Sequence, residues 1–403
     1  MGLFIFNKHL IWSGPNADGG ISFYYYYDAI TWIVGGLALA WLTWVLVKRY
    51  LRARALRRPH RRTNYRLLKR IVEIKDELSR RFLPLGVSNN IHAVGIGMLG
   101  AQYCIQVFVN DANQELWNGS GATALPNNYR GVPMVLIEMP AAGFLSANGI
   151  RDHQEVIIGG ISGANTNLTG QSGTIGYFCT RKSKFRRPKE IHLLSNSHVF
   201  ADLQKARVDD GDLIMQPSPG ERGSNRPIGT LVNFSALTFG GEVTEPNHID
   251  AAIAKLWAPQ QHEALLPFIG AVKGYVAKKD IKIGEPARKC GRTTGYTEGR
   301  IFSIYLDIWV RYDRTRQSAF FQNQLLVEPA SPAFQEFVAK GDSGSLLVDA
   351  EQHAIGLIFG GMSDASAITP PPPNTNAVQR VSGYGVANPI SDVLERLKIE
   401  LLV

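Results

Sequence analysis

The sequence predicts a mainly β protein with a small α/β accessory module and an N-terminal transmembrane helix. From about residue 170 onward, short apolar runs are broken by Gly, Pro, Asn or Asp every ten or so residues, which is typical of antiparallel barrels and sandwiches. Near the N-terminus, a long apolar run carries no charge. Of the 403 residues, 45% are hydrophobic and 19% charged, so the chain can bury a sizeable core and is not disordered throughout.

The apolar run covers residues 30–47 and contains no Asp, Glu, Lys or Arg. At about 1.5 Å per residue, a helix of this length reaches about 27 Å, close to the roughly 30 Å hydrocarbon layer of a bilayer. Aromatic residues at 23–27 precede it, as is common at a membrane–water interface. A buried core helix would carry a polar face, and a cleaved signal peptide would not be followed by arginines. We therefore assign a transmembrane helix to residues 29–48 and a short non-cytoplasmic N-terminus to residues 1–28.

Positive charge is concentrated directly after this run. Eleven Lys and Arg residues and no Asp or Glu lie from Lys48 to Arg70. We call this segment the basic stripe, and its formal positive charge is larger than the net charge of the whole chain, +9. Only Lys8 precedes the helix, and the positive-inside rule then places the bulk of the chain in the cytoplasm. Such a stripe can bind anionic lipid or nucleic acid, and its place beside a membrane helix favours lipid over nucleic acid. We expect a single-pass membrane protein with a cytoplasmic main domain.

The stripe leads into an amphipathic helix. Apolar residues recur at three- and four-residue steps over residues 66–82, which predicts a helix and a candidate pairing surface in a homo-oligomer. Residues 49–85 are therefore assigned as a basic juxtamembrane segment with this helix, residues 86–164 as the accessory module, and residues 165–403 as the main β domain. The expected strands of the module are 92–98, 104–110 and 132–139; those of the main domain include 174–180, 191–195, 249–256, 299–307, 325–329, 344–349 and 354–360, before a final helix at 389–401.

Three segments of the main domain carry residue types that suit nucleophilic catalysis. LLSNSHVF contains His198, NHIDAAIAKL contains Asp250, and KGDSGSLLVD contains Ser343. A serine hydroxyl is a weak nucleophile at neutral pH, so an imidazole must accept its proton and a carboxylate must orient that imidazole. Gly341 and Gly344 allow a sharp turn around the serine, where main-chain N–H groups can converge on a developing oxyanion. We predict a Ser-His-Asp triad.

With the histidine, aspartate and serine in this order and the serine in a GDSGS motif, the sequence over roughly residues 158–398 resembles that of the trypsin/chymotrypsin-like serine peptidases. The resemblance implies a chymotrypsin-like double β-barrel with the site in the cleft between the barrels. It makes His198 the general base and then acid, Asp250 its orienting partner and Ser343 the nucleophile. The N–H groups of Gly341 and Ser343 would form the oxyanion hole. The implied activity is that of a serine endopeptidase acting on proteins or peptides through an acyl-enzyme, with no cofactor and no metal ion.

The resemblance also suggests a substrate pocket formed by Phe337, Gly360 and Gly361. In trypsin-like enzymes that cleave after Lys or Arg, an Asp stands six residues before the nucleophile, and here that position is Phe337. We therefore expect a preference for an apolar or small residue before the scissile bond.

The residue before the serine bears on how the site is activated. In digestive members of the family, a freshly cut N-terminus inserts beside the Asp that precedes the serine, here Asp342. At least 150 residues precede the barrel, so this route is not expected, and the alternatives are constitutive competence or control by the accessory module or an outside signal.

Cys104, Cys179 and Cys290 lie in or beside apolar runs without C-x-x-C spacing, which predicts core residues in a reducing compartment.

Two other function classes compete with the enzyme. One is a catalytically silent, membrane-tethered pseudoprotease or sensor that binds a protein partner. The other is a nucleic-acid-responsive membrane effector that works through the basic stripe. The presence of all three triad residue types favours the peptidase, because a pure binding protein does not require them.

Overall fold

The structure is a computed structural model, and it divides the chain into two compact units, Met1–Arg57 and Arg58–Val403. The boundary falls inside the segment 49–85. The residues that the structure describes are 8–15, 21–27, 41, 43–45, 47, 65–84, 90–109, 127–138, 151–168, 170–182, 190–203, 211–221, 225–240, 243–258, 260–313, 315–330, 336–362, 379–380 and 383–403.

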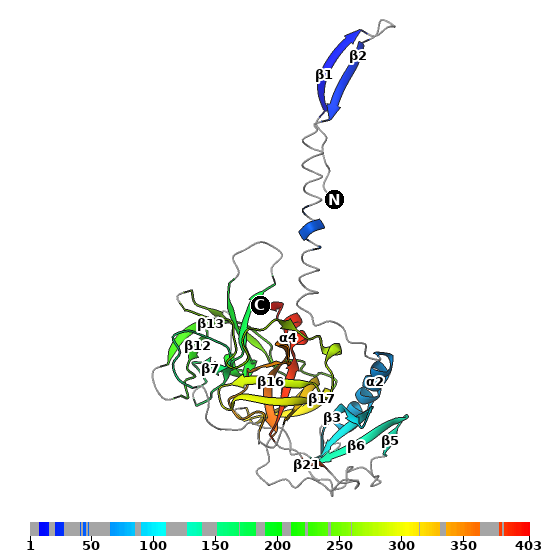
Figure 1. The fold of residues 1–403 in the computed structure, drawn as a ribbon, viewed down its shortest axis with the longest axis vertical. Coiled ribbons are helices and arrows are strands. Elements are labelled where there is room, and N and C mark those ends of the chain that lie inside the picture. The colour runs from blue at the N-terminus through cyan, green and yellow to red at the C-terminus, as the bar shows by residue number, and fades with distance from the viewer. Residues whose placement is uncertain are drawn as a thin grey trace. The chain divides into compact units, whose positions relative to one another are not determined.

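The first unit contains a β-hairpin. Strands β1 (Lys8–Pro15) and β2 (Ile21–Tyr27) pair antiparallel, and the aromatic run noted above forms most of β2 (Figure 1). Most of the predicted transmembrane helix lies outside the described residues; positions 41, 43–45 and 47 are helical, and Trp41, Trp44 and Val47 among them are exposed. Within the described part of the chain, no helix has both the length and the apolar character needed to cross a bilayer.

The second unit begins its main β domain with a seven-stranded antiparallel sheet. Its strand order is β23-β10-β11-β14-β13-β12-β8, and the short strands β7 and β9 pair beside it. We call this sheet, with β7 and β9, the first barrel; no pairing joins its end strands β23 and β8 among the described residues, and buried Val, Ile, Leu and Phe side chains from successive strands fill its interior. The bounds are β7 Ile161–Ser162, β8 Ala164–Asn165, β9 Thr174–Ile175, β10 Tyr177–Arg181, β11 His192–Ser195, β12 Leu213–Gln216, β13 Arg226–Phe234, β14 Ala252–Leu256 and β23 Ile399–Leu401.

The second barrel is a closed ring of six strands. It runs β16-β17-β18-β22-β20-β19 and closes because β16 pairs with both β17 and β19. Closure leaves no unpaired edge within the ring. The bounds are β16 Pro286–Gly291, β17 Gly295–Tyr312, β18 Gln317–Pro329, β19 Leu346–Val348, β20 His353–Met362 and β22 Tyr384–Pro389, with β15 Gly274–Tyr275 paired to β20.

The residues predicted as an accessory module continue the sheet of the second barrel. Strand β3 (Ile91–Leu99) pairs with the second half of β17, and β4 (Gln102–Val109) and β6 (Val132–Glu138) extend from it (Figure 1). Helix α2 (Tyr65–Phe82) packs against this extension through its apolar face. The remaining short elements are β5 Asn128–Tyr129, which pairs with β6, and β21 Gln379–Arg380, which also pairs with β6.

The mainly β prediction is confirmed, while one end of the chain differs. A helix was expected over residues 389–401, but α4 covers only Ile390–Arg396. Lys398 adopts a φ of 55°, which breaks the helix, and the residues after it form β23 and pair with β10. The apolar residues of β23 were predicted as the last turn of the helix, but their side chains point inward from a barrel strand.

Candidate active site

Antiparallel pairing brings the imidazole and the carboxylate together. Strand β11 pairs with β14, with Ser195 opposite Ala252. The chain leaving β11 and the chain entering β14 therefore lie side by side, which places His198, on the short helix α3 (Ser197–Phe200), next to Asp250. The His198 Nδ1 lies 2.5 Å from the Asp250 Oδ2, and the His198 main-chain N–H donates to Oδ1 at 3.2 Å. This pair of bonds fixes which ring nitrogen faces the carboxylate.

Asp250 is completely buried and accepts a further bond from a tyrosine. Tyr312, at the end of β17, donates its hydroxyl to Asp250 Oδ2 at 2.7 Å. Asn196 and Asn388 anchor the main chain of Asp250 with bonds of 2.7 and 3.1 Å to its carbonyl oxygen. Burial, followed by the charge of Asp250 and the hydrogen bond to it, raises the pKa of Tyr312 well above its ordinary value. The phenol therefore stays protonated and remains a donor to the carboxylate.

Ser343 lies in the turn between β18 and β19, and two glycines shape that turn. Gly341 and Gly344 have φ values of 104° and 99°, which residues with a side chain rarely adopt. The turn is attached to the first barrel because Thr174 N donates to Ser343 O and Thr174 Oγ1 donates to Gly341 O, both at 2.8 Å. Ser195 of β11 in turn donates to Thr174 O at 2.7 Å. Thr174 thus connects the serine turn with the strand that precedes the histidine.

His198 and Ser343 line one cleft of about 230 Å³, with walls from both barrels. The Ser343 hydroxyl contacts the Phe359 carbonyl oxygen at 3.5 Å, the long limit of a hydrogen bond, and makes no other hydrogen bond with the described residues. Catalytic hydrogen bonds often tighten only when substrate is bound, so a rotation of this side chain can complete the set. The structure therefore brings His198 and Asp250 into contact and places Ser343 in the same cleft.

Two main-chain donors beside the serine are open. The N–H groups of Gly341 and Ser343 donate to no acceptor within the described part of the chain, although both residues are buried. Both residues line the cleft, so an open pair of N–H groups on this turn is a place where an anionic oxygen can be stabilised.

Asp342, between these donors, is held by a buried lysine. Lys289 Nζ lies 3.0 Å from Asp342 Oδ2, and both side chains are fully buried. The main-chain N–H groups of Thr293 and Thr294 donate to Oδ1 at 2.8 and 3.1 Å, and that of Ala339 donates to Oδ2 at 3.0 Å. Burial alone would raise the pKa of Asp342, but the charge of Lys289, the hydrogen bond from the Thr294 hydroxyl at 2.6 Å and that from Ala339 N outweigh it and lower the pKa. An internal ammonium group thus neutralises the carboxylate that digestive peptidases pair with a new N-terminus.

A second, smaller pocket beside Ser343 differs from the sequence-based assignment in one residue. Gly360 and Gly361 line it, as expected, but Phe337 does not. The Phe337 ring is completely buried in the core of the second barrel, and the following residue, Val338, forms the pocket wall. Val338 belongs to the same core, so a core side chain forms this wall of the pocket.

The cysteines do not contribute a nucleophile to this site. Cys104, Cys179 and Cys290 are free and completely buried. Burial raises the pKa of Cys104 and Cys290 to about 11, so these thiols stay protonated at neutral pH. Their prediction as core residues is confirmed.

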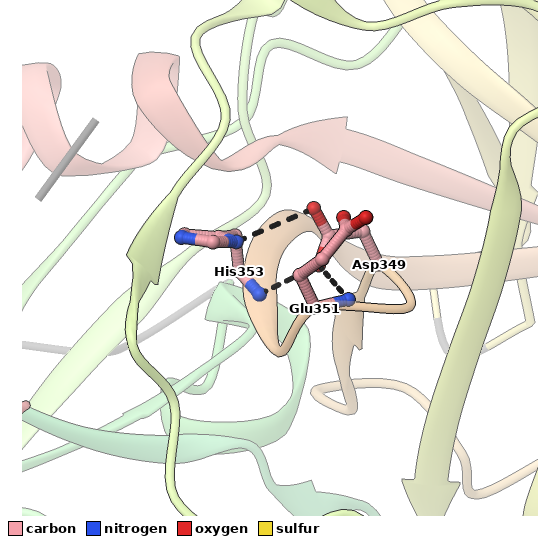
Figure 2. A group of neighbouring side chains, drawn as sticks. All are labelled: Asp349, Glu351 and His353. Atoms are coloured by element: carbon pink, nitrogen blue, oxygen red, sulfur yellow. Dashed lines mark hydrogen bonds and ion pairs between the residues drawn. The ribbon is translucent and has the colours of Figure 1, made fainter. Parts of the chain in front are cut away.

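One group of side chains with the chemistry of metal ligands lies apart from the cleft. Asp349, Glu351 and His353 present ligand atoms within 4.8 Å of one another at the turn between β19 and β20 (Figure 2). The Asp349 Oδ1 already accepts the main-chain N–H groups of Glu351 and His353 at 2.9 and 2.8 Å. These bonds account for the group as the cap of a tight turn.

Comparison with known proteins gives similarity at the level of solved structures. No family model and no curated protein matches the sequence. The chain is similar to Thermobifida fusca protease A, with 16% identity over 62% of this chain and 99% of that one and a TM-score of 0.39. It is also similar to Cellulomonas bogoriensis chymotrypsin, with 17% identity, 61% and 98% coverage and a TM-score of 0.36, and to a glutamic acid-specific serine protease, with 15% identity, 61% and 100% coverage and a TM-score of 0.39.

The solved structures it resembles are trypsin- or chymotrypsin-like serine proteases. At such identities and TM-scores, the likeness says nothing about activity. Any activity has to follow from the side chains of this chain.

Three residues of the site were not predicted from the sequence: Thr174, Lys289 and Tyr312. Tyr312 lies 62 residues from Asp250, and Lys289 lies 53 residues from Asp342, so no local pattern connects the partners. For Lys289, the sequence does contain one indication of its role. It lies two residues after the buried Ala287 in β16, and a lysine on the inward face of a strand requires a partner.

Proposed function

We propose that the protein is a membrane-anchored serine endopeptidase that hydrolyses peptide bonds of protein or peptide substrates. The observation that carries the proposal is the 2.5 Å contact between His198 Nδ1 and the buried Asp250 carboxylate, in a cleft that Ser343 also lines. The two open N–H groups on the serine turn support the same reaction.

In the proposed acylation step, His198 accepts the proton of the Ser343 hydroxyl while Oγ attacks the substrate carbonyl carbon. The carbonyl oxygen becomes an oxyanion and accepts hydrogen bonds from the N–H groups of Gly341 and Ser343. His198 then gives the proton to the leaving amine, the C–N bond breaks, and an acyl-enzyme remains. A water molecule, deprotonated by His198, releases the acid and restores the serine. Asp250 stabilises the imidazolium throughout.

Replacing the nucleophile tests this mechanism. Ser343→Ala in the full chain should lower the rate of peptide cleavage by about 10⁶-fold, and adding His198→Ala should lower it little further, because a triad acts as a unit. The measurement is cleavage of a quenched peptide library by protein in detergent. Cleavage that persists in Ser343→Ala would contradict the mechanism, and a wild-type chain that cleaves no peptide would favour the silent pseudoprotease.

The proposal includes a single membrane span at residues 29–48, a cytoplasmic peptidase domain and a basic stripe, residues 48–70, lying on anionic lipid. The uncharged run and the excess of Lys and Arg after it support this placement. The exposed Trp41 and Trp44 side chains on helical residues of this segment agree with a surface that faces lipid.

A further inference from the structure

The small pocket beside Ser343 has almost no free volume. It measures about 10 Å³, roughly the space that one water molecule needs. Its walls come from Val338 and Ile358 and from Gly360 and Gly361, next to the serine itself. The resemblance noted in the sequence would place the side chain before the scissile bond against Gly360 and Gly361, and the space beside them holds little more than a methyl group.

The volume is small because one valine fills a notch between two paired glycines. Gly361 of β20 lies opposite Gly385 of β22. A Cβ on Gly361 would lie 2.6 Å from Val338 Cγ2, and a Cβ on Gly385 would lie 2.9 Å from Val338 Cγ1. Each methyl group of Val338 therefore occupies the space that one of the glycines leaves. The glycines accommodate the valine instead of opening the pocket to a substrate.

Val338 cannot move aside easily. The main chain on both sides of it is fixed, because Phe337 N donates to Gly383 O at 2.8 Å, Thr297 Oγ1 donates to Phe337 O at 2.8 Å, and Ala339 N donates to Asp342 Oδ2 at 3.0 Å. The side chain is 2% exposed, and a β-branched residue has little freedom about χ1. No acidic residue is among those that line the pocket, so a basic substrate side chain would find no counter-charge there.

We propose that Val338 restricts the residue before the scissile bond to glycine, alanine or serine. This inference rests on the proposed peptidase function and narrows its substrate class. One methylene more or less in an apolar pocket changes specificity by about 10- to 200-fold. The wild-type chain should therefore cleave after alanine at least 100-fold faster, in kcat/KM, than after leucine, phenylalanine or arginine.

The test compares quenched peptides that differ only in that residue, using the full chain in detergent. Val338→Gly should raise kcat/KM for the leucine and phenylalanine peptides at least tenfold and change the alanine peptide only a few-fold. Val338→Ala should do the same to a smaller degree, and it serves if the glycine variant fails to fold. Val338→Thr, which keeps the branched shape, is the matched control and should keep the preference for alanine.

Active-site titration with a fluorophosphonate separates this inference from the proposed function. A wild-type chain that is not labelled would overturn both. A labelled wild-type chain that prefers leucine, phenylalanine or arginine would overturn the role of Val338 and leave the peptidase intact. A labelled Val338→Gly chain with the wild-type preference would overturn it as well.

Discussion

Asp250 depends on a phenol as well as on an imidazole. Its Oδ2 accepts from both His198 Nδ1 and the Tyr312 hydroxyl, at 2.5 and 2.7 Å. The His198 and Tyr312 rings also pack edge to face, with centroids 5.5 Å apart. In the proposed mechanism, Tyr312 is a positioning residue that would act through the carboxylate and the imidazole, from the wall of the same cleft.

Tyr312→Phe removes the hydroxyl and keeps the ring contact. A hydrogen bond to a charged group contributes about 1.5–3 kcal/mol, so we expect kcat to fall roughly tenfold or more with little change in KM. Tyr177→Phe is the matched control, because that hydroxyl is also bonded, but it donates to Ala264 O at 2.6 Å and not to Asp250. Steady-state kinetics on one peptide checks both. A Tyr312→Phe chain with the wild-type kcat would contradict the proposed positioning role of the Tyr312 hydroxyl.

At the scale of elements, the serine turn is held by a strand of its own barrel. Lys289 of β16 and the residues just before β17 surround Asp342, so groups of the β domain itself bond the turn that carries Gly341 and Ser343. This arrangement agrees with the expectation that the site does not depend on a freshly cut N-terminus.

Lys289→Met leaves the Asp342 carboxylate buried without its counter-charge. Breaking a buried pair typically costs about 3–5 kcal/mol, and we expect a loss of this order at pH 7. Because the wild-type pKa of Asp342 is lowered, the pair's stabilisation is complete above the unfolded pKa of about 4 and is lost as pH falls through the folded pKa. In the variant, burial raises that pKa, so the stability difference from wild type should shrink between pH 7 and pH 4.

Urea unfolding at several pH values measures this difference. The exposed pair between Lys255 and Glu190 provides the control, and Lys255→Met should leave stability nearly unchanged. A Lys289→Met chain as stable as wild type at pH 7, or a difference that grows on acidification, would contradict the assigned role of the ion pair.

Elements with a clear local pattern were predicted well, and contacts across the fold were not. The three- and four-residue spacing placed helix α2 within one residue, and β3, β4 and β6 within two. Strand β17 was predicted far too short, because Tyr305 at a φ of 50° and bulges against β18 interrupt its alternation without ending it. The GDSGS turn was predicted correctly because the glycines that the sharp turn needs are next to the serine in the sequence. Tyr312 and Lys289 act only through long-range pairing.

At the scale of the whole molecule, the second unit is one body from helix α2 to the C-terminal strand. Lys75 of α2 is fully buried, and its Nζ lies 2.8 Å from Asp307 of β17. Five residues later, the same strand supplies Tyr312, whose hydroxyl donates to the Asp250 carboxylate. The helix that follows the basic stripe is therefore built into the barrel that carries the site.

The proposed membrane placement can be checked by labelling. A membrane-impermeant maleimide applied to intact cells should react with Ser13→Cys, which lies before the predicted span. It should react with Lys273→Cys, on an exposed side chain of the β domain, only after permeabilisation. The native cysteines are buried and give a low background. Labelling of Lys273→Cys in intact cells would contradict the cytoplasmic placement.

Mass spectrometry of the full chain after reaction with a fluorophosphonate shows whether Ser343 is an activated nucleophile. We expect a single adduct on the Ser343 peptide, absent from Ser343→Ala and strongly reduced in His198→Ala and in urea. A wild-type chain without an adduct, or an adduct that persists in Ser343→Ala, would contradict this expectation.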